Sequence, residues 1–353
     1  MEGISAAKNV LVTGGCGFIG SNFIRYLYHR YPDYRIFNLD LLTYAGNPEN
    51  LNDLELLEER TPGAQKRYHF IYGDVCDSRL LDIIFRRHDF QLVINFAAET
   101  HVDRSIVNIS DFIRTNIGGV RALVEAVRAH GVPRLVHIST DEIYGDMPEG
   151  YAAEDAPLRP SNPYASSKAA ADLIVQSFIR THRVPAIIVR GSNNYGPYQY
   201  PEKLIPLAIS NIIEGKKVPV HGTGEHARSW LHVEDFARAV DLVACESPLY
   251  EVYNVAGEER RNIDILKMIA ASLGVALDEH AEHINDRPGA DMRYAPDSTK
   301  LRQNLGWSPT HSVEESFPGI VSWYLDNQDW WKKIKEKREY ADHYEKQSRG
   351  AWY

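Results

Sequence analysis

The sequence predicts an α/β protein with a doubly wound parallel sheet, followed by a smaller C-terminal α/β part. Short apolar runs rich in β-branched residues alternate along the chain with stretches of helical periodicity. The runs are almost continuously apolar, which is typical of strands buried on both faces of a parallel sheet. A glycine-rich turn separates the first run from the first helical stretch, as in βαβ units that bind nucleotides.

The elements of the predicted sheet follow one another in a regular order. Six strands are expected, at residues 9–13, 35–40, 69–72, 92–97, 134–139 and 186–190. The main helical stretches between them lie at residues 21–30, 80–87, 113–130 and 166–183. Each crossover between parallel strands is expected to be right-handed.

The alternation weakens after about residue 190, where residues 193–197 are rich in asparagine, tyrosine, glycine and proline. We therefore expect residues 1–190 to form a nucleotide-binding part. Residues 191–331 are expected to form mainly a substrate-binding part, with some chain returning to the first. Residues 332–353 carry seven basic and four acidic side chains, which predicts a polar, solvated terminal helix.

The composition limits the kind of partner. The 353 residues include 39 basic and 48 acidic side chains, a net charge of −9, so a nucleic-acid polymer is a poor candidate. Three scattered cysteines are too few for a disulfide framework or a zinc site, and His101 and the other histidines lack metal-ligand spacing. Residues 1–7 lack the apolar core of a signal peptide, and no run is long enough to span a bilayer. We expect no metal, no membrane contact and a cytoplasmic location.

The glycine-rich turn predicts a dinucleotide site. Gly14, Gly17 and Gly20 have a G-x-x-G-x-x-G spacing, which allows a tight bend, backbone approach to a pyrophosphate and close helix–strand packing. Asp40 ends the next strand, where a carboxylate accepts hydrogen bonds from the adenine ribose and repels a 2′-phosphate. The turn therefore predicts a Rossmann-type fold that binds NAD rather than NADP.

Two later segments fit the same cofactor. Asp74 and Val75 follow the third strand, where a carboxylate can meet the adenine amino group. Phe96, Ala97 and Ala98 lie at the carboxyl end of the fourth strand, where small residues let the backbone pass close to the cofactor.

A tyrosine–lysine pair predicts catalysis at the same edge of the sheet. Tyr164 and Lys168 are four residues apart, so they share one face of a helix. The ammonium of Lys168 is expected to lower the pKa of Tyr164, so that the phenol acts as a base near neutral pH. A tyrosine and a lysine four residues apart are common by chance. Here Thr140 lies upstream of the pair, at the carboxyl end of the fifth strand, and this position favours a catalytic role for the pair.

The glycine turn, the tyrosine–lysine pair and the strand order resemble the extended short-chain dehydrogenase/reductases, and within them the dTDP-glucose 4,6-dehydratases. The resemblance covers about residues 9–331. It rests on the segments at residues 42–47, 98–105, 139–145, 193–199, 201–206 and 286–289. The triplet Thr140-Asp141-Glu142 is the most specific part, because related epimerases and decarboxylases usually lack the Asp-Glu pair.

The resemblance implies that dTDP-glucose is converted to dTDP-4-keto-6-deoxyglucose. Carbon 4 would be oxidised transiently with bound NAD, water would leave across carbons 5 and 6, and the hydride would return to carbon 6. Tyr164 would remove the carbon-4 hydroxyl proton, Thr140 would hydrogen-bond the same oxygen, and Lys168 would tune Tyr164. Glu142 would take the carbon-5 proton, and protonated Asp141 would donate to the departing hydroxyl.

The resemblance also implies two sets of binding residues. The cofactor set is Gly14, Gly17, Phe18, Ile19, Gly20, Asp40, Leu41, Leu42, Thr43, Asp74, Val75, Phe96, Ala97, Ala98, Thr100, Thr115, Tyr164, Lys168 and Asn194. The substrate set is Thr100, Thr140, Asn193, Lys203, Leu204, Pro219, Val220, His221, Arg228, Asn262 and Arg287. Arg228 is the preferred diphosphate ligand, because a guanidinium binds phosphate through two parallel hydrogen bonds.

Several alternatives stay open. Ser229 and Ala290 stand where the family usually has Asp and His, at the nucleotide end, so a UDP-glucose 4,6-dehydratase is one alternative. Another epimerase or decarboxylase of the same scaffold is a second, against which Asp141 and Glu142 argue. An inactive dinucleotide-binding regulator is a third, against which the retained tyrosine–lysine pair argues. The family resemblance further implies a homodimer that pairs the helices at residues 113–130 and 164–183.

Overall fold

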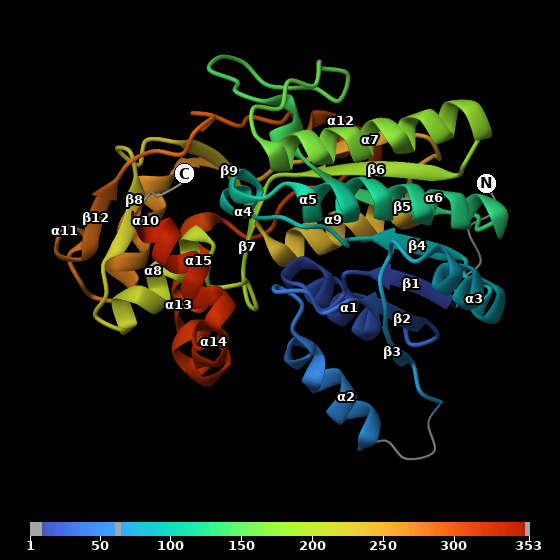
Figure 1. Cartoon of the computed structure of the whole chain (residues 1–353), viewed down its shortest axis with the longest axis horizontal. Coiled ribbons are helices and arrows are strands. Elements are labelled where there is room, and N and C mark those ends of the chain that lie inside the picture. Colours follow the sequence, from blue (N-terminus) through green and yellow to red (C-terminus); the bar gives the residue numbers. More distant parts are fainter. Residues whose placement is uncertain (1–8, 61–64, 350–353) are drawn as a thin grey trace.

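Seven parallel strands form the central sheet of the computed structural model, which describes residues 9–60 and 65–349 (Figure 1). They are β1 (Asn9–Thr13), β2 (Arg35–Asp40), β3 (Tyr68–Tyr72), β4 (Leu92–Asn95), β5 (Leu135–Thr140), β6 (Ala186–Gly191) and β10 (Val252–Val255). Their order across the sheet is β3-β2-β1-β4-β5-β6-β10. The order reverses between β1 and β4, and open α/β sheets bind ligands beyond the carboxyl ends of the strands at such a point.

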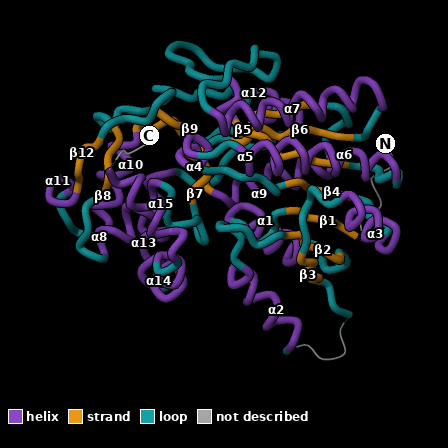
Figure 2. Tube along the Cα trace, in the orientation of Figure 1, coloured by secondary structure: helices purple, strands orange, loops and turns teal. Residues whose placement is uncertain are grey.

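Helices cover both faces of this sheet (Figure 2). One face packs against α1 (Phe18–Arg30), α9 (Val233–Glu246) and α12 (Thr299–Leu305). The other face packs against α3 (Ser78–His88), α6 (Val120–Ala129) and α7 (Pro163–His182). Successive side chains of β1 alternate between the two cores: Val10 and Val12 join the first, and Leu11 joins the second. The predicted doubly wound sheet is therefore confirmed.

A smaller α/β part with its own hydrophobic core lies beside the carboxyl edge of the sheet (Figure 1). Its strands are β7 (Asn193–Tyr195), β8 (Val218–His221), β9 (Ala227–His232), β11 (Glu258–Arg261) and β12 (Ala281–Ile284). Its helices are α8 (Leu204–Ile213), α10 (Asn262–Ser272), α11 (Leu277–His280), α13 (Val313–Asp326), α14 (Gln328–Lys335) and α15 (Arg338–Arg349). No helix in the described part of the chain is long and apolar enough to cross a membrane.

The remaining short elements lie in the connections between the strands and helices of the larger part. They are η1 (Pro48–Leu51), α2 (Asn52–Glu59), α4 (Val102–Val107), α5 (Ser110–Phe112), the π-helical η2 (Ile113–Gly119) and the 3₁₀ turn η3 (Asp141–Tyr144). The continuous helix predicted at residues 113–130 is thus a π-helical turn followed by α6. Asn116 in this turn bonds the backbone N–H and carbonyl of Glu99 and the hydroxyl of Ser167, and these contacts hold the widened turn against the site.

The C-terminal segment is helical as predicted, but the prediction that it is solvated is wrong. Helices α14 and α15 pack on the smaller part, where Trp331, Ile334 and Tyr340 are buried in its core. These apolar residues recur at helical spacing among the lysines, so a polar composition hides one buried face. The last four residues of the predicted tail, and the N-terminal segment 1–7, lie outside the described residues.

Replacing Trp331 by alanine is expected to lower the free energy of unfolding by about 3–5 kcal/mol, because its fully buried indole would leave a cavity. Urea unfolding of the purified protein measures this loss. Leu325→Ala is the matched control, because Leu325 is exposed in the preceding helix and should change stability little. A Trp331→Ala variant as stable as the control would show that the C-terminal helices are not packed.

Candidate active site

The glycine turn after β1 has the shape that a pyrophosphate needs. Gly14 has a φ of +70°, and a Cβ there would lie 2.6 Å from the backbone nitrogen of Ala97. A Cβ on Gly20 would lie 2.3 Å from the carbonyl oxygen of Gly14. Helix α1 begins at Phe18 with no side-chain cap and no acidic residue in its first turn. Its amide groups and positive dipole end therefore suit an anion, so these residues fit a dinucleotide.

Asp40 at the end of β2 is held by the backbone. Its two carboxylate oxygens accept the N–H groups of Cys16 and Leu42, each at 2.8 Å. A carboxylate has lone pairs left after two such bonds, so it can still accept ribose hydroxyls. Leu42 was expected to bind the cofactor, but it lies outside the cavity lining and holds Asp40 through its amide.

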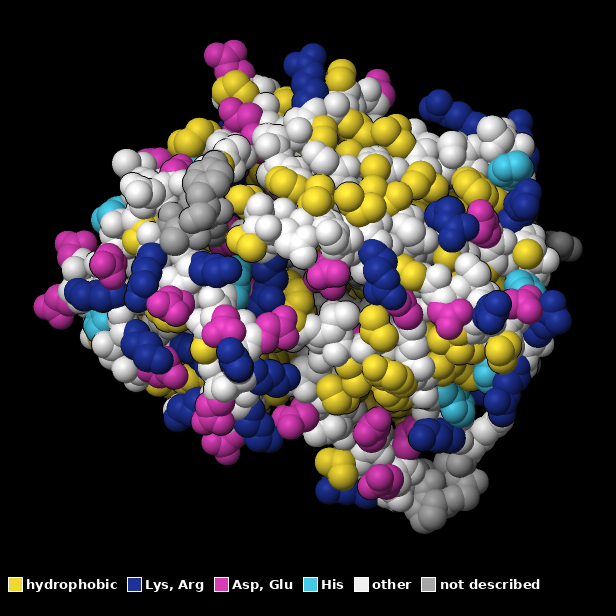
Figure 3. All heavy atoms as spheres, in the orientation of Figure 1, with side chains coloured by type: hydrophobic (Ala, Val, Ile, Leu, Met, Phe, Trp, Pro, Cys, Tyr) yellow, Lys and Arg dark blue, Asp and Glu magenta, His cyan; other side chains and the backbone are white. Residues whose placement is uncertain are grey.

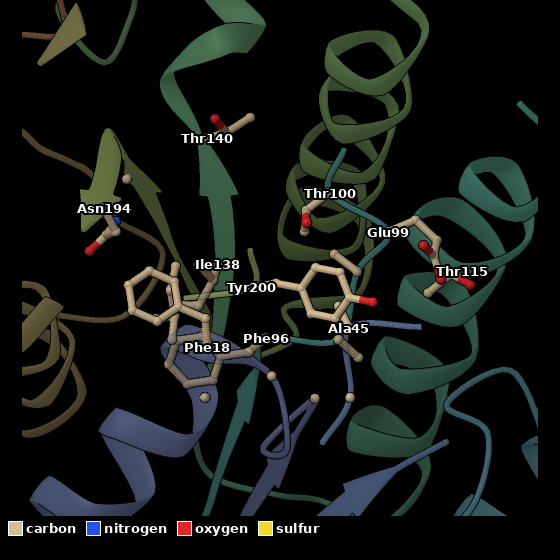
Figure 4. Close-up of a pocket in the computed structure, with 18 of the residues that line it drawn as sticks. Phe18, Ala45, Phe96, Glu99, Thr100, Thr115, Ile138, Thr140, Asn194 and Tyr200 are labelled. Carbon is tan, nitrogen blue, oxygen red and sulfur yellow. The ribbon is translucent and has the colours of Figure 1, made fainter. Parts of the chain in front are cut away.

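A cavity of about 280 Å³ runs along the carboxyl edge of the sheet (Figure 4). With the exception of Leu42, all residues expected to bind the cofactor line it. Figure 4 shows Phe18 at the start of α1 and Thr140 at the end of β5, with Thr115 and Glu99 close together. Sequence reasoning did not assign several further lining residues, among them Ala45, Gly46, Glu99, Ser192, Gln199, Tyr200, Glu202 and Phe236.

A second cavity, of about 150 Å³, adjoins the first on the side of the smaller part. Of the expected substrate residues it is lined by Thr100, Asn193, Lys203, Leu204, Pro219, His221, Arg228, Asn262 and Arg287. Thr140 lines the first cavity instead, and Val220 is buried in the hydrophobic core. Glu142, Asn193 and Lys203 are among the residues that line both cavities. A molecule that occupies the second cavity can therefore reach a cofactor in the first.

The five expected catalytic side chains meet beside this junction. Thr140 ends β5, and Asp141 and Glu142 follow it in η3. The hydroxyl of Thr140 accepts the backbone N–H of Glu142 at 3.3 Å. Tyr164 lies in the first turn of α7, and the Nζ of Lys168, one turn later, donates to the carbonyl of Ile138 at 2.7 Å. All five line the first cavity.

The neighbouring carboxyls Asp141 and Glu142 have different electrostatic surroundings. Burial, reinforced by the charge of Glu142, raises the pKa of Asp141 to about 8. Burial also raises the pKa of Glu142, but the cations Arg228, Lys203 and Arg287 oppose that rise. The surroundings thus favour the protonated form of Asp141, while the three cations favour the charged form of Glu142, the arrangement that an acid–base pair requires.

The structure does not show the expected lowering of the Tyr164 pKa. Burial raises that pKa, the charge of Glu142 adds to the rise, and a hydrogen bond with Thr140 opposes it. Burial also lowers the pKa of Lys168 to about 8. The sequence spacing correctly places the pair on one face of α7, but it does not reveal how little water surrounds the pair.

Two residues that sequence reasoning missed hold Arg228 at the second cavity. The hydroxyl of Tyr294 donates to the carboxylate of Asp291 at 2.8 Å and approaches that of Glu142 at 3.5 Å. The guanidinium of Arg228 lies 4.2 Å from the ring centroid of Tyr294 and donates to the carbonyl of Asp291 at 2.8 Å. Asp291 and Tyr294 follow the segment 286–289, and that proximity is the sequence signal that could have found them.

Among the residues that the structure describes, the fold also gathers two histidine–carboxylate groups, each of which includes residues far apart in the sequence. They are His101 with Glu202 and His343, and His232 with Glu234 and His311. Arg104 and Lys203 help to lower the pKa values of His101 and His343 after burial, and their charges would oppose a cation at the first group. The absence of a metal stays a prediction.

Raising the pH above about 8 is expected to reduce the rate of product formation, because Asp141 then loses the proton that it would donate. The ordinary pKa of an aspartate is near 4, so the raised value keeps the acid form at neutral pH. Lys168 titrates in the same range, and a spectroscopic signal separates the two groups. Loss of the Asp141 proton should let reduced cofactor accumulate during turnover, whereas loss of the Lys168 charge should suppress its formation.

A parallel sheet of this order, with a glycine turn at its first crossover and a Tyr–Lys pair beside the end of β5, defines an extended short-chain dehydrogenase/reductase. The family model described as GDP-mannose 4,6 dehydratase matches residues 11–318. The dTDP-glucose 4,6-dehydratase of Streptomyces niveus is 44% identical over 335 residues, which are 94% of this chain and 96% of that protein. That of Escherichia coli is 41% identical and covers 93% of this chain and 96% of its own length. The chain belongs to the dTDP-glucose 4,6-dehydratase family.

Solved structures agree with this assignment. The dTDP-glucose 4,6-dehydratase from Bacillus anthracis in complex with NAD is 40% identical, with a TM-score of 0.85 over 93% of this chain and 100% of that one. The enzyme of the same name from Streptomyces venezuelae, with NAD bound, has a TM-score of 0.87 at 40% identity over 93% of this chain and 100% of that one. A UDP-glucose 4-epimerase from Thermotoga maritima shares the fold at a TM-score of 0.81 but is 27% identical, over 91% of this chain and 99% of that one.

Proposed function

We propose that this protein is an NAD-dependent dTDP-glucose 4,6-dehydratase, a hydro-lyase that forms dTDP-4-keto-6-deoxyglucose. The observation that carries the proposal is the junction of the two cavities, where Tyr164, Asp141 and Glu142 lie together. A 4-epimerase needs the tyrosine but has no elimination step, so it does not require a carboxylic acid and a carboxylate there. The names of the relatives support the same reading.

The residues would divide the reaction between them. When bound along the glycine turn, NAD supplies the acceptor for the carbon-4 hydride and later the donor to carbon 6. Tyr164 would take the proton of the carbon-4 hydroxyl as a phenolate, which requires the positive charges of Lys168 and bound NAD to outweigh the effect of burial on its pKa. Thr140 hydrogen-bonds the same oxygen. The new ketone makes the carbon-5 proton acidic, and Glu142 removes it. Asp141 gives its proton to the carbon-6 hydroxyl, which leaves as water.

The substrate would place its nucleotide in the second cavity. Lys203, Arg228 and Arg287 supply positive charge for the diphosphate. These placed cations and the start of α1 explain how a chain of net charge −9 can bind anionic ligands. We further propose that residues 1–190 mainly hold the cofactor and that residues 191–331 mainly hold the sugar nucleotide.

Incubation with dTDP-, UDP- and CDP-glucose at equal concentrations tests the function. A 4-keto-6-deoxy product from dTDP-glucose, formed fastest of the three, is the expected result. Ser229 and Ala290 lie in or beside the second cavity, so a preference for UDP-glucose would change the nucleotide but keep the reaction. A 4-epimer product would replace the proposal by an epimerase. Lack of turnover with all three would favour the dinucleotide-binding regulator.

The protein is also proposed to be a cytoplasmic homodimer. Exposed hydrophobic side chains gather over α5, η2 and α7, where Ile109, Ile113 and Leu173 are exposed (Figure 3). Such a patch suits a second copy of the chain. The three cysteines are free, which fits a reducing compartment. Light scattering of the purified protein tests the dimer, and a Leu173→Glu variant should be monomeric.

A further inference from the structure

We propose that the C-terminal helix α15 completes the sugar-nucleotide cavity, and that Gln347 on this helix positions Arg287 through Asp103. Helix α15 lies beyond residue 318, where the match to the family model ends. The inference rests on the proposed function, because it assigns Arg287 to the diphosphate. It gives the C-terminal helix a role in substrate binding.

Gln347 connects the helix to the cavity. Its side chain is 2% exposed, yet it lines the second cavity. Its Nε2 donates to the carboxylate of Asp103 at 3.2 Å and to the backbone carbonyl of Glu202 at 3.1 Å. Its Oε1 is buried and accepts no hydrogen bond from the residues that the structure describes. A buried amide with one free acceptor beside a cavity is suited to meet a ligand donor as well.

Asp103 lies between Gln347 and Arg287 and contacts both. This carboxylate is fully buried, and its Oδ1 lies 2.6 Å from the Nε of Arg287. Its Oδ2 receives the Gln347 hydrogen bond. Gln347 thus donates the hydrogen bond to this carboxylate, while Arg287 contacts its other oxygen as an ion pair and not as a hydrogen-bond donor. Asp103 pairs with the Nε of Arg287, and Nη2 lies 3.5 Å from the Nε2 of His221, which also lines the second cavity. A phosphate there would use the Nη groups and share Nη2 with His221.

Contacts along the helix fix Gln347 in place. The hydroxyl of Tyr340 donates to the carbonyl of Pro201 at 3.1 Å, one residue before Glu202. Glu339 pairs with Arg104 at 2.9 Å, and the same arginine pairs with Glu202 at 3.0 Å. Helix α15 is thus attached to the same segments that supply cavity residues, rather than to a distant surface.

Removing the Gln347 amide would leave one oxygen of a buried carboxylate without its donor. Arg287 would then be less well ordered for the diphosphate. We expect a rise of about tenfold in the KM for dTDP-glucose, as for loss of a hydrogen bond to a charged group. The kcat and the affinity for NAD should change little, because Tyr164 and the glycine turn lie in the other cavity.

Gln347→Met tests the inference, because methionine keeps the volume but not the hydrogen bonds. Steady-state kinetics with dTDP-glucose, and calorimetric titration with dTDP and NAD separately, give the three quantities needed. Glu345→Gln is the matched control, since Glu345 lies on the same helix with a side chain 63% exposed. The expected result is weaker dTDP binding and a higher KM for Gln347→Met alone, with unchanged NAD affinity. Its melting temperature should fall, because the carboxylate of Asp103 and the carbonyl of Glu202 each lose a buried donor.

A double variant tests the route through Asp103. If Gln347 acts through that carboxylate, Asp103→Asn combined with Gln347→Met should bind dTDP no more weakly than Asp103→Asn alone. Unchanged dTDP affinity in Gln347→Met, or equal losses of dTDP affinity, NAD affinity and stability, would overturn the inference. Failure of the wild-type protein to convert any nucleotide-glucose would instead refute the proposed function, and the dTDP titration would still decide the role of Gln347.

Discussion

Glu142→Gln is expected to stop the reaction after carbon 4 has been oxidised, with product formation slowed by about 10²–10⁴-fold. Glutamine keeps the shape of the side chain but cannot accept the carbon-5 proton. Tyr164 and Lys168 stay in place, so the first step should still occur. Mixing the variant with dTDP-glucose should therefore build up the absorbance of enzyme-bound NADH without releasing a ketosugar.

The control for this experiment is Glu149→Gln, since Glu149 is exposed in the loop after η3. That variant should turn over like the wild type and show no lasting NADH signal. If Glu142→Gln formed product at the normal rate, another group would have to take the carbon-5 proton. Glu142 would then not be the base of the proposed acid–base pair.

Tyr164→Phe is expected to block the first step, with turnover reduced by about 10²–10⁴-fold. The variant lacks the phenol oxygen that would take the carbon-4 hydroxyl proton. It should form neither NADH nor product, and this distinguishes it from Glu142→Gln. Binding of NAD and dTDP should persist, because the glycine turn and the cations of the second cavity are untouched. Stopped-flow absorbance and calorimetric titration measure the two properties.

Tyr151→Phe is the companion control, because the Tyr151 side chain is exposed and should be replaceable without loss of activity. Accumulation of NADH in Tyr164→Phe would show that a different group accepts the hydroxyl proton. Such a result would assign Tyr164 to binding alone.

The parts of the site that the sequence predicted are those defined by local spacing. The glycine turn needs one strand, one bend and one helix, and Asp40 needs only the end of the following strand. Tyr164 and Lys168 share a helix face because they are four residues apart. These features depend on short-range geometry, so their residue order was sufficient to place them.

The parts that the sequence did not predict depend on tertiary contacts. Trp331 is buried in a core that also contains residues of α8 and α10, more than fifty residues earlier in the chain, and the surrounding lysines concealed this in the sequence. Gln347 meets Asp103 across 244 residues. The raised pKa of Tyr164 follows from burial by several segments together, which the spacing of one lysine does not reveal.

Transfer of a label within the substrate tests the central claim most directly. We expect deuterium placed at carbon 4 of dTDP-glucose to appear at carbon 6 of the product, because the hydride removed in the first step is the one returned in the last. Nuclear magnetic resonance of the product locates the label. Loss of the deuterium to water, or its retention at carbon 4, would contradict transient oxidation of carbon 4 with return of the hydride to carbon 6.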